Sequence, residues 1–251
     1  MGAGVPDCPF LKYNKVDKTM KKIAVAIDGP GGAGKSTISK AIAKKLGIIY
    51  VDTGALYRTV GYYARENGLS VDDVKVSEKI TPLLGGINIE IQYIDGAQHV
   101  ILNGEDLGDK IRQPDISMYA SAVSSVPSVR AFLLEAQKDL ARKNSVIMDG
   151  RDIGTVILPE AEVKVFLTAS NEARATRRYK ELIAKGVEVK YEDVLSEMNK
   201  RDHADSTRAA APLKPADDAH YFDNSDYDFD GSVEYIINLI EEKTGVKRIE
   251  E

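Results

Sequence analysis

Residues 29–36 read Gly-Pro-Gly-Gly-Ala-Gly-Lys-Ser, and this stretch decides the fold of the chain. It follows a short apolar run, Ile23–Ile27, that is typical of a buried parallel strand. It precedes an amphipathic pattern from Lys35 to Leu46, which predicts a helix that ends at Gly47. A glycine-rich turn ending in Lys-Ser, between a strand and a helix, is the P-loop pattern. Its backbone N–H groups converge on phosphate oxygens at a helix N-terminus, so the stretch predicts binding of a nucleoside triphosphate.

Each position of this loop has an expected part in holding the triphosphate and its metal ion. The Lys35 ammonium can reach the β- and γ-phosphates, and the Ser36 hydroxyl can contact Mg²⁺. Asp149 follows a later strand and is expected to hold the same ion through water. The residues expected to bind the triphosphate are Gly29, Pro30, Gly31, Gly32, Ala33, Gly34, Lys35, Ser36 and Thr37.

The rest of the chain alternates between strand and helix patterns, which predicts an α/β fold. A second helix is expected from Thr53 to about Asn67. A parallel sheet covered by helices on both faces follows from this alternation. We expect five strands in this sheet. They are Ile23–Ile27, Ile48–Val51, Ser145–Met148, Val163–Leu167 and His220–Phe222.

One segment interrupts this order and is expected to be an insertion. Ile87–Tyr93 alternates with period two, Asp95-Gly96 is a hairpin signal, and Val100–Leu102 continues the pattern. We expect a small antiparallel sheet here, together with helices at about 115–125 and at 127–143, the second opened by a proline.

Composition excludes several classes of protein. The 251 residues are 43% hydrophobic and 29% charged, and no apolar run reaches the roughly 20 residues of a membrane span. A net charge of −5 argues against general nucleic-acid binding. The only cysteine, Cys8, excludes a disulfide framework and, with three histidines, argues against structural zinc. We expect a cytoplasmic protein that acts on something small, with residues 1–19 as a disordered leader or tag.

Three functions remain open for a chain that binds a triphosphate: a GTP-dependent switch, a small-molecule kinase, and a binding module without catalysis. Residues 199–202 read Asn-Lys-Arg-Asp and fit the guanine-recognition pattern of GTPases. In GTPases that motif follows a buried strand, whereas here it ends an amphipathic segment, Tyr191–Met198, that reads as a helix. This position argues against the switch.

The arginines favour the kinase. They are concentrated in short polar motifs, where Arg is suited to a bidentate grip on phosphate. The motifs at 52–58 and 149–154 each follow a predicted strand, where ligands lie in doubly wound sheets. Arg174, Arg177 and Arg178 share one helix face, and like charges this close are costly unless an anion meets them.

Taken together, these motifs resemble those of the bacterial cytidylate kinases. The resemblance rests on residues 29–35, 52–58 and 149–154, and on Arg201-Asp-x-x-Asp205-x-x-Arg208 followed by Ala-Pro-Leu. It runs from about Met20 to the end of the chain. It implies a P-loop kinase core at 20–57 and 145–251 with a helical lid at about 172–190, and a monophosphate-binding insertion at 58–144.

The resemblance also implies an activity, the transfer of a phosphoryl group from ATP to CMP or dCMP with Mg²⁺, by a monomeric enzyme with no nucleic-acid or membrane partner. Arg177 would contact ATP. The expected catalytic residues are Lys35, Arg151, Arg174 and Arg178. The expected substrate-binding residues are Thr53, Arg58, Ser121, Arg130, Arg151, Asp152, Arg201, Asp205 and Arg208.

Within this set, the resemblance implies that Ser121, Arg130 and Asp152 recognise the cytosine base of the substrate. An Asp152 carboxylate can accept from the exocyclic amine of cytosine, while uracil would present an oxygen to it. Kinases of UMP, AMP or dTMP remain the nearest rivals.

Overall fold

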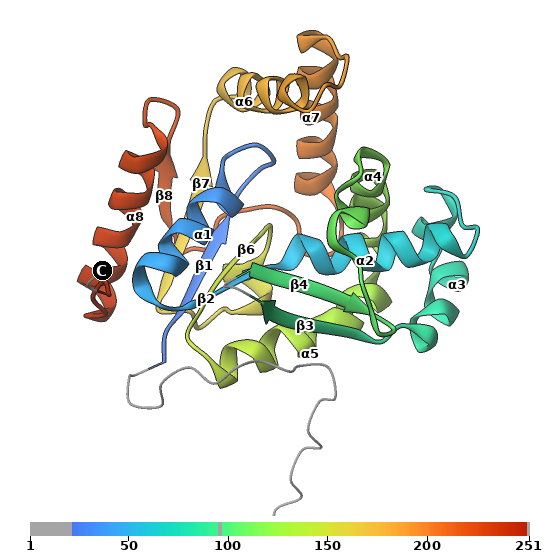
Figure 1. Ribbon diagram of the computed structural model, residues 1–251, viewed down its shortest axis with the longest axis horizontal. Helices are drawn as coiled ribbons and strands as arrows, with labels where there is room; N and C mark the ends of the chain where they lie inside the picture. Colours follow the sequence, from blue (N-terminus) through green and yellow to red (C-terminus); the bar gives the residue numbers. More distant parts are fainter. Residues whose placement is uncertain (1–21, 95–96, 250–251) are drawn as a thin grey trace, which may run out of the picture. The chain divides into compact units, whose positions relative to one another are not determined.

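The computed structural model describes residues 22–94 and 97–249 (Figure 1). The expected leader at 1–19 and the hairpin turn at 95–96 lie outside the described residues. The chain divides into two compact units, which we name the core unit (Lys22–Asp52 and Ser145–Glu251) and the insertion unit (Thr53–Asn144). The first boundary follows Asp52, a few residues before the predicted 57/58. The second boundary lies at 144/145, and the sequence analysis expected 144/145. No helix within the described ranges is long and apolar enough to cross a membrane.

A five-stranded sheet, all of whose neighbouring strands run parallel, forms the centre of the core unit. Its order is β2-β6-β1-β7-β8, so β1 with the P-loop lies in the middle (Figure 1). The five predicted strands are confirmed to within two residues. Their bounds are β1 Ala24–Asp28, β2 Ile49–Asp52, β6 Val146–Gly150, β7 Val163–Thr168 and β8 His220–Asp223.

Three helices of the core unit connect these strands, and a fourth, α8, follows the last strand. They are α1 Lys35–Leu46, α6 Asn171–Ala184, α7 Tyr191–Thr207 and α8 Phe229–Thr244, with a π-helical turn at Ile153–Ile157. Helix α1 ends where expected, because Gly47 takes the left-handed conformation (φ 64°). Helices α6 and α7 pack on each other, and we call them the helical hairpin.

Helix α7 is longer than the sequence analysis predicted. It continues through residues 199–202 to Thr207, since no glycine or proline interrupts it. The Asn-Lys-Arg-Asp stretch therefore lies inside a helix and not at its end. A guanine-recognition loop would need these side chains at the end of a strand, so the GTPase interpretation has no structural basis here.

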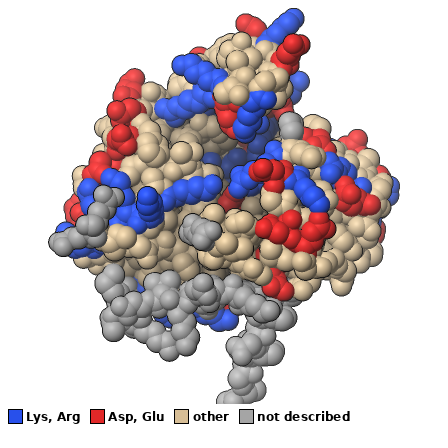
Figure 2. All heavy atoms as spheres, in the orientation of Figure 1, with Lys and Arg blue, Asp and Glu red and all other residues tan. Residues whose placement is uncertain are grey.

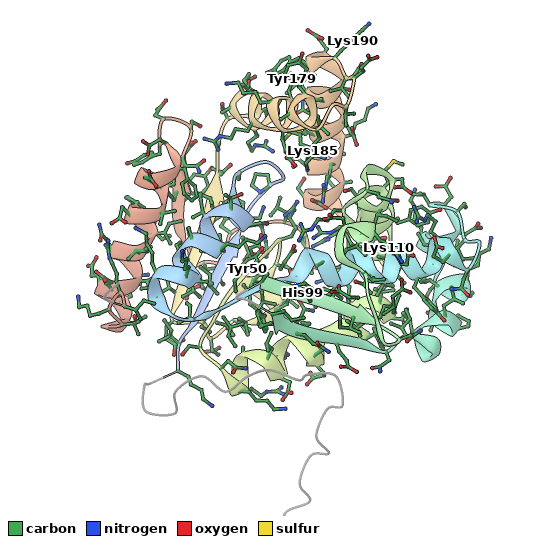
Figure 3. The ribbon with its side chains drawn as sticks, in the orientation of Figure 1. Tyr50, His99, Lys110, Tyr179, Lys185 and Lys190 are labelled. Atoms are coloured by element: carbon green, nitrogen blue, oxygen red, sulfur yellow. The ribbon has the colours of Figure 1, made fainter. Side chains whose placement is uncertain are left out.

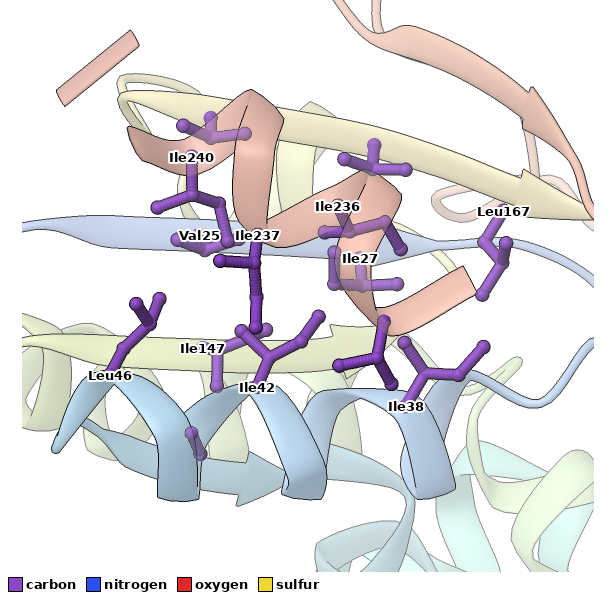
Figure 4. Packing of buried hydrophobic residues seen from close by; sticks show 14 of the residues in the cluster. Val25, Ile27, Ile38, Ile42, Leu46, Ile147, Leu167, Ile236, Ile237 and Ile240 are labelled. Carbon is purple, nitrogen blue, oxygen red and sulfur yellow. The ribbon is translucent and has the colours of Figure 1, made fainter. Parts of the chain in front are cut away.

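Apolar side chains of α1, α8 and the central strands pack into one cluster (Figure 4). Ile38 and Ile42 face inward from α1, and Ile236 and Ile237 face inward from α8. Each is at most 3% exposed, and Ile27 of β1 lies among them, fully buried. Burying side chains of this kind contributes roughly 1.5–3 kcal/mol each. The cluster thus supports the strand and the helix that flank the P-loop.

The insertion unit contains a three-stranded antiparallel sheet, β3 Ile89–Ile94, β4 Ala97–Leu102 and β5 Glu105–Asp106. The third strand was not predicted, because two residues are too short to show a pattern. Four helices complete the unit: α2 Thr53–Glu66, α3 Ser77–Ile80, α4 Pro114–Val123 and α5 Pro127–Lys143. Short 3-10 turns at Asp73–Lys75, Thr81–Gly86 and Gly108–Arg112 link them.

Gly29 is the position at which only glycine fits between β1 and β7. Its φ is +149°, and a Cβ added there would lie 1.9 Å from the carbonyl oxygen of Leu167. This close approach brings the start of the P-loop against the neighbouring strand. A side chain at Gly31, by contrast, would meet nothing nearer than an arginine nitrogen 3.7 Å away.

We expect Gly29→Ala to lower the unfolding free energy by about 3 kcal/mol or more, because a methyl group would overlap backbone that cannot retreat. Thermal unfolding without ligand measures this. The matched control is Gly31→Ala, two residues along the same loop, which is expected to change the melting temperature little. Similar melting temperatures for both variants would contradict the packing argument.

Candidate nucleotide-binding site

Three aspartates mark the carboxyl edge of the parallel sheet. Asp28 ends β1, Asp52 ends β2, and Asp149 lies one residue before the end of β6. Asp149 pairs in register with Ile27 of β1 and with Asp52 of β2. All three side chains are at most 7% exposed. The edge therefore concentrates buried negative charge next to the P-loop, which explains why cationic groups and a metal ion suit this place.

The P-loop itself encloses Lys35. Gly34 takes the left-handed conformation (φ 88°) just before α1 begins. Lys35 is 6% exposed, and its ammonium donates to the carbonyl oxygen of Pro30 at 2.7 Å. Burial lowers the pKa of Lys35 well below its usual range, and the positive charge of Arg151 lowers it further, while Asp149 opposes the shift. A cation held inside a ring of backbone amides is suited to a polyphosphate.

Ser36 and Asp149 form a pair at the first turn of α1. The Ser36 hydroxyl donates to Asp149 Oδ2 at 2.6 Å, and the Tyr50 hydroxyl donates to Asp149 Oδ1 at 2.9 Å. Burial raises the pKa of Asp149, as does the nearby charge of Asp52, while Lys35 opposes the shift.

These groups fit Mg²⁺. A serine hydroxyl that donates its proton to a carboxylate keeps its lone pairs for a cation, and Mg²⁺ prefers oxygen ligands. Where the chain is described, no three His, Cys, Asp or Glu side chains gather as a metal cluster.

Asp28 connects the P-loop strand to the loop that follows β6. Its carboxylate accepts from the backbone N–H of Ile153 and of Gly154, both at 2.7 Å. Burial raises its pKa to about 6, since the opposing effect of those two amides is smaller. The contact fixes the position of Asp152 and the π-helical turn that begins at Ile153. Sequence analysis did not single out Asp28, although its place directly before the first P-loop glycine was a usable signal.

The three arginines of α6, which the spacing places on one helix face, take different partners in the fold. Arg174 is 3% exposed and donates to the carbonyl oxygen of Gly31 at 2.9 Å and to Asp202 at 2.5 Å. Arg178 pairs with Glu181 at 2.8 Å. Protein carbonyls and carboxylates thus relieve the mutual repulsion without a bound anion.

Arg177 turns toward the end of β8. It donates to the side-chain and backbone oxygens of Asn224 at 3.0 and 2.9 Å. The Asn224 amide in turn donates to the carbonyl oxygen of Ala33 in the P-loop at 3.2 Å. Asn224 was missed by the sequence analysis, because a lone asparagine after a strand carries no motif. Asn224 therefore connects Arg177 to the P-loop.

The helical hairpin and the P-loop together line a small pocket. Its walls are formed by Gly31, Gly32, Arg178, Met198, Arg201 and Asp202. Lys and Arg side chains are spread over the hairpin at the top of Figure 2, and Tyr179, Lys185 and Lys190 are labelled on it in Figure 3. The sequence-predicted Arg178 and Arg201 therefore meet the P-loop within the core unit.

The Arg201–Arg208 motif is organised around Asp205. Arg151 donates to Asp205 Oδ2 at 2.9 Å, and Arg201 lies 4.0 Å from the same oxygen. Burial opposes ionisation of Asp205, but Arg151 outweighs it and lowers the pKa of this carboxyl. Arg208 lies 3.5 Å from Asp152. Five of the predicted substrate-binding residues of the core unit are thus linked in two ion-pair groups.

Arg151 also lies close to the P-loop. A Cβ added to Gly31 would lie 3.7 Å from its Nη2. Its pKa is raised, because the attraction of Asp205 outweighs the effect of burial. A guanidinium that remains charged beside the phosphate loop can neutralise charge that develops during phosphoryl transfer.

The insertion unit holds the remaining predicted residues. Thr53 begins α2 and is 3% exposed, and Arg58 lies on the second turn of the same helix, half-buried. Arg130 of α5 donates to the carbonyl oxygen of Ser124 at 3.3 Å, and the Ser124 hydroxyl donates to the carbonyl oxygen of Ser121. Arg130 and Ser121 are therefore connected through Ser124 at the end of α4.

The raised pKa of Asp28 predicts a pH-dependent contribution to stability. Because the folded chain holds this proton more tightly than the unfolded chain, the contribution is complete below about pH 3.8 and is lost as the pH rises through 6. Relative to Asp28→Asn, the unchanged chain should lose up to about 3 kcal/mol of unfolding free energy over this range. Denaturant unfolding of both proteins at several pH values measures the difference.

Asp193→Asn, at an exposed position on α7, is the control for removing one carboxylate. An unfolding free energy of the unchanged chain that stays constant relative to Asp28→Asn as the pH rises, or that increases relative to it, would contradict the assignment.

Comparisons with known proteins identify a family for the chain. The family model described as cytidylate kinase matches residues 25–242. A cytidylate kinase of Caldicellulosiruptor saccharolyticus is 50% identical over 220 residues, which cover 88% of this chain and 96% of that protein. A cytidylate kinase of Thermosipho melanesiensis is 47% identical over 219 residues, which cover 87% of this chain and 97% of that one.

Solved structures with a similar outline include shikimate kinase from Bacteroides thetaiotaomicron (TM-score 0.45, 15% identity, 88% of this chain and 98% of that chain). Deoxyadenosine kinase from M. mycoides matches with a TM-score of 0.42 and 14% identity, over 88% of this chain and 99% of that chain. The assignment rests on the sequence relatives. The family model matches most of the chain, and half of the aligned residues are identical over nearly the full length of a relative. This chain therefore belongs to the cytidylate kinase family of nucleoside monophosphate kinases.

Proposed function

We propose that this enzyme transfers the γ-phosphoryl group of ATP to CMP and dCMP, with Mg²⁺, and forms CDP and dCDP. The observation that carries the proposal is the Lys35, Ser36 and Asp149 arrangement at the carboxyl edge of β1 and β6. Its family membership supports the acceptor, since the relatives are named cytidylate kinases. We carry forward a monomeric, cytoplasmic enzyme as part of the same proposal.

Positioning and charge neutralisation supply most of the catalysis in such a transfer. The P-loop amides and Lys35 would hold the donor phosphates, and Ser36 and Asp149 would hold Mg²⁺. When bound, that ion neutralises charge on the phosphate oxygens. The acceptor is an ionised phosphate and is itself a nucleophile, so the reaction needs no general base.

The proposed lid is the predicted range of about 172–190, which takes in α6 of the helical hairpin and the loop that leads to α7. Closure over ATP would exclude water, which otherwise competes with the acceptor. Arg174 and Arg178 are its proposed catalytic arginines, and Arg177 its ATP contact. Arg174 already donates to the P-loop carbonyl of Gly31, so it would act on the donor side with its existing partners in place.

Acceptor recognition is assigned residue by residue. Arg58, Arg151 and Arg208 would bind the CMP phosphate, and Thr53, Arg201 and Asp205 would contact the pentose. Ser121, Arg130 and Asp152 would read the base. The two ion-pair groups of the core unit support these assignments, because a carboxylate that pairs with an arginine holds the guanidinium in a fixed direction, and a guanidinium is suited to binding phosphate.

An assay of ADP release, with ATP, Mg²⁺ and each of CMP, dCMP, UMP, AMP and GMP in turn, tests the function. ADP is expected with the cytosine nucleotides only. Turnover with another monophosphate would overturn the assigned acceptor. ATP binding without turnover by the unchanged enzyme would indicate a binding module.

Lys35→Met should lower kcat severely, because it removes the ammonium from the donor phosphates. Thermal melting of the variant shows whether it stays folded.

Asp152→Asn is expected to reduce the preference for CMP over UMP, measured as the ratio of the two kcat/KM values, by about tenfold or more. An amide can turn its N–H₂ toward the uracil oxygen, which the carboxylate repels. Loss of the Arg208 pairing affects both substrates alike, so the ratio isolates base recognition. An unchanged ratio would contradict the proposal that Asp152 recognises the cytosine base.

A further inference from the structure

Tyr50 is a buried tyrosine whose hydroxyl is directed at the site. It lies on β2, is 7% exposed, and belongs to the apolar cluster with Ile38 and Ile42 of α1. Figure 3 labels it within the core unit, beside α1. A phenylalanine would fill the same space. The hydroxyl is therefore the informative part of the side chain, because a buried O–H must find a partner.

Strand register explains why this hydroxyl reaches Asp149. Tyr50 pairs with Ile147 on β6, and Asp52 pairs with Asp149. Tyr50 and Asp149 are thus diagonal neighbours two residues apart in register, and side chains at that spacing share one face of a sheet. This is the face that α1 covers, since Tyr50 and Ile147 both pack in its cluster. The phenol bridges the diagonal distance and donates to Asp149 Oδ1 at 2.9 Å.

Ser36 reaches the same carboxylate from the first turn of α1, and its hydroxyl donates to Oδ2 at 2.6 Å. The two oxygens of Asp149 are therefore held from different elements, one by the sheet and one by the P-loop helix. A carboxylate held on one oxygen cannot rotate about its Cβ–Cγ bond without losing that hydrogen bond. The Tyr50 contact consequently determines which way Oδ2 points.

We propose that Tyr50 is a positioning residue, which holds Asp149 Oδ1 so that Oδ2 stays directed at Ser36 and at the Mg²⁺ that accompanies ATP. This inference rests on the proposed Mg²⁺-dependent function. Groups that orient metal-binding carboxylates by hydrogen bonds typically affect metal affinity or activity ten- to a hundredfold. If Tyr50 were only a core residue, removing its hydroxyl would change stability and nothing else.

Tyr50→Phe removes one oxygen atom and keeps the ring. We expect the Mg²⁺ concentration for half-maximal rate to rise about tenfold, with the KM for CMP unchanged. The second readout is a binding measurement without turnover. Calorimetry gives the dissociation constant of ATP without Mg²⁺ and with Mg²⁺, and the readout is the ratio of the first to the second. That ratio should fall about tenfold in Tyr50→Phe, while ATP binding without Mg²⁺ stays the same.

Tyr235→Phe is the matched control. The Tyr235 hydroxyl also lies in the core unit and is hydrogen-bonded, at 2.7 Å, to His220 Nε2 and not to Asp149. It should leave both Mg²⁺ readouts unchanged. Combining Tyr50→Phe with Asp149→Asn should add no further loss of Mg²⁺ dependence, because the group that Tyr50 positions is already altered.

An unchanged Mg²⁺ dependence in Tyr50→Phe, an equal shift in Tyr235→Phe, or full additivity with Asp149→Asn would each overturn the inference. If the unchanged enzyme phosphorylates none of the monophosphates, the proposed function fails, yet the ATP-binding ratio still tests Tyr50. If the unchanged enzyme is active and Tyr50→Phe matches it in both readouts, only this inference fails.

Discussion

The Asp28 carboxylate, buried at the end of the central strand, supports the rest of the site. Its two backbone hydrogen bonds, to Ile153 and Gly154, join the strand that leads into the P-loop to the loop that follows β6. Keeping a carboxylate this deep raises its pKa, so the fold retains the group at a cost in solvation. These hydrogen bonds hold the start of the P-loop next to the segment that follows β6.

The other charged residues of the core unit follow the same rule, since each buried charge has a counter-charge or an oriented dipole. Lys35 rests on the Pro30 carbonyl, Arg151 on Asp205, and Arg174 on Gly31 and Asp202. Pre-arranged groups of this kind need little reorganisation when phosphates arrive. The P-loop carbonyls of Pro30, Gly31 and Ala33 accept from cationic or amide side chains, which hold the loop at three points.

Periodicity was a reliable guide to the elements, and a poor guide to what charged side chains contact. The five strands of the parallel sheet, helix α1 and helix α5 lie within two residues of their predicted bounds, because apolar spacing and Gly or Pro signals determine them locally. The arginines of α6 share a face by spacing, yet they diverge to Asp202, Asn224 and Glu181. Glu181 lies one turn along α6 itself, but Asp202 comes from α7 and Asn224 from the end of β8, and no local pattern can supply those two partners.

The sequence by itself determined the fold class, the P-loop and the family, since a glycine-rich turn between strand and helix and the spaced Arg and Asp motifs carry their chemistry within a few residues. Tertiary structure alone decided which side chains hold those motifs in place. Asp28, Tyr50 and Asn224 act on residues far away in sequence, at the ends of neighbouring strands. Strand order and register bring them together, and these depend on packing of the whole sheet against its helices.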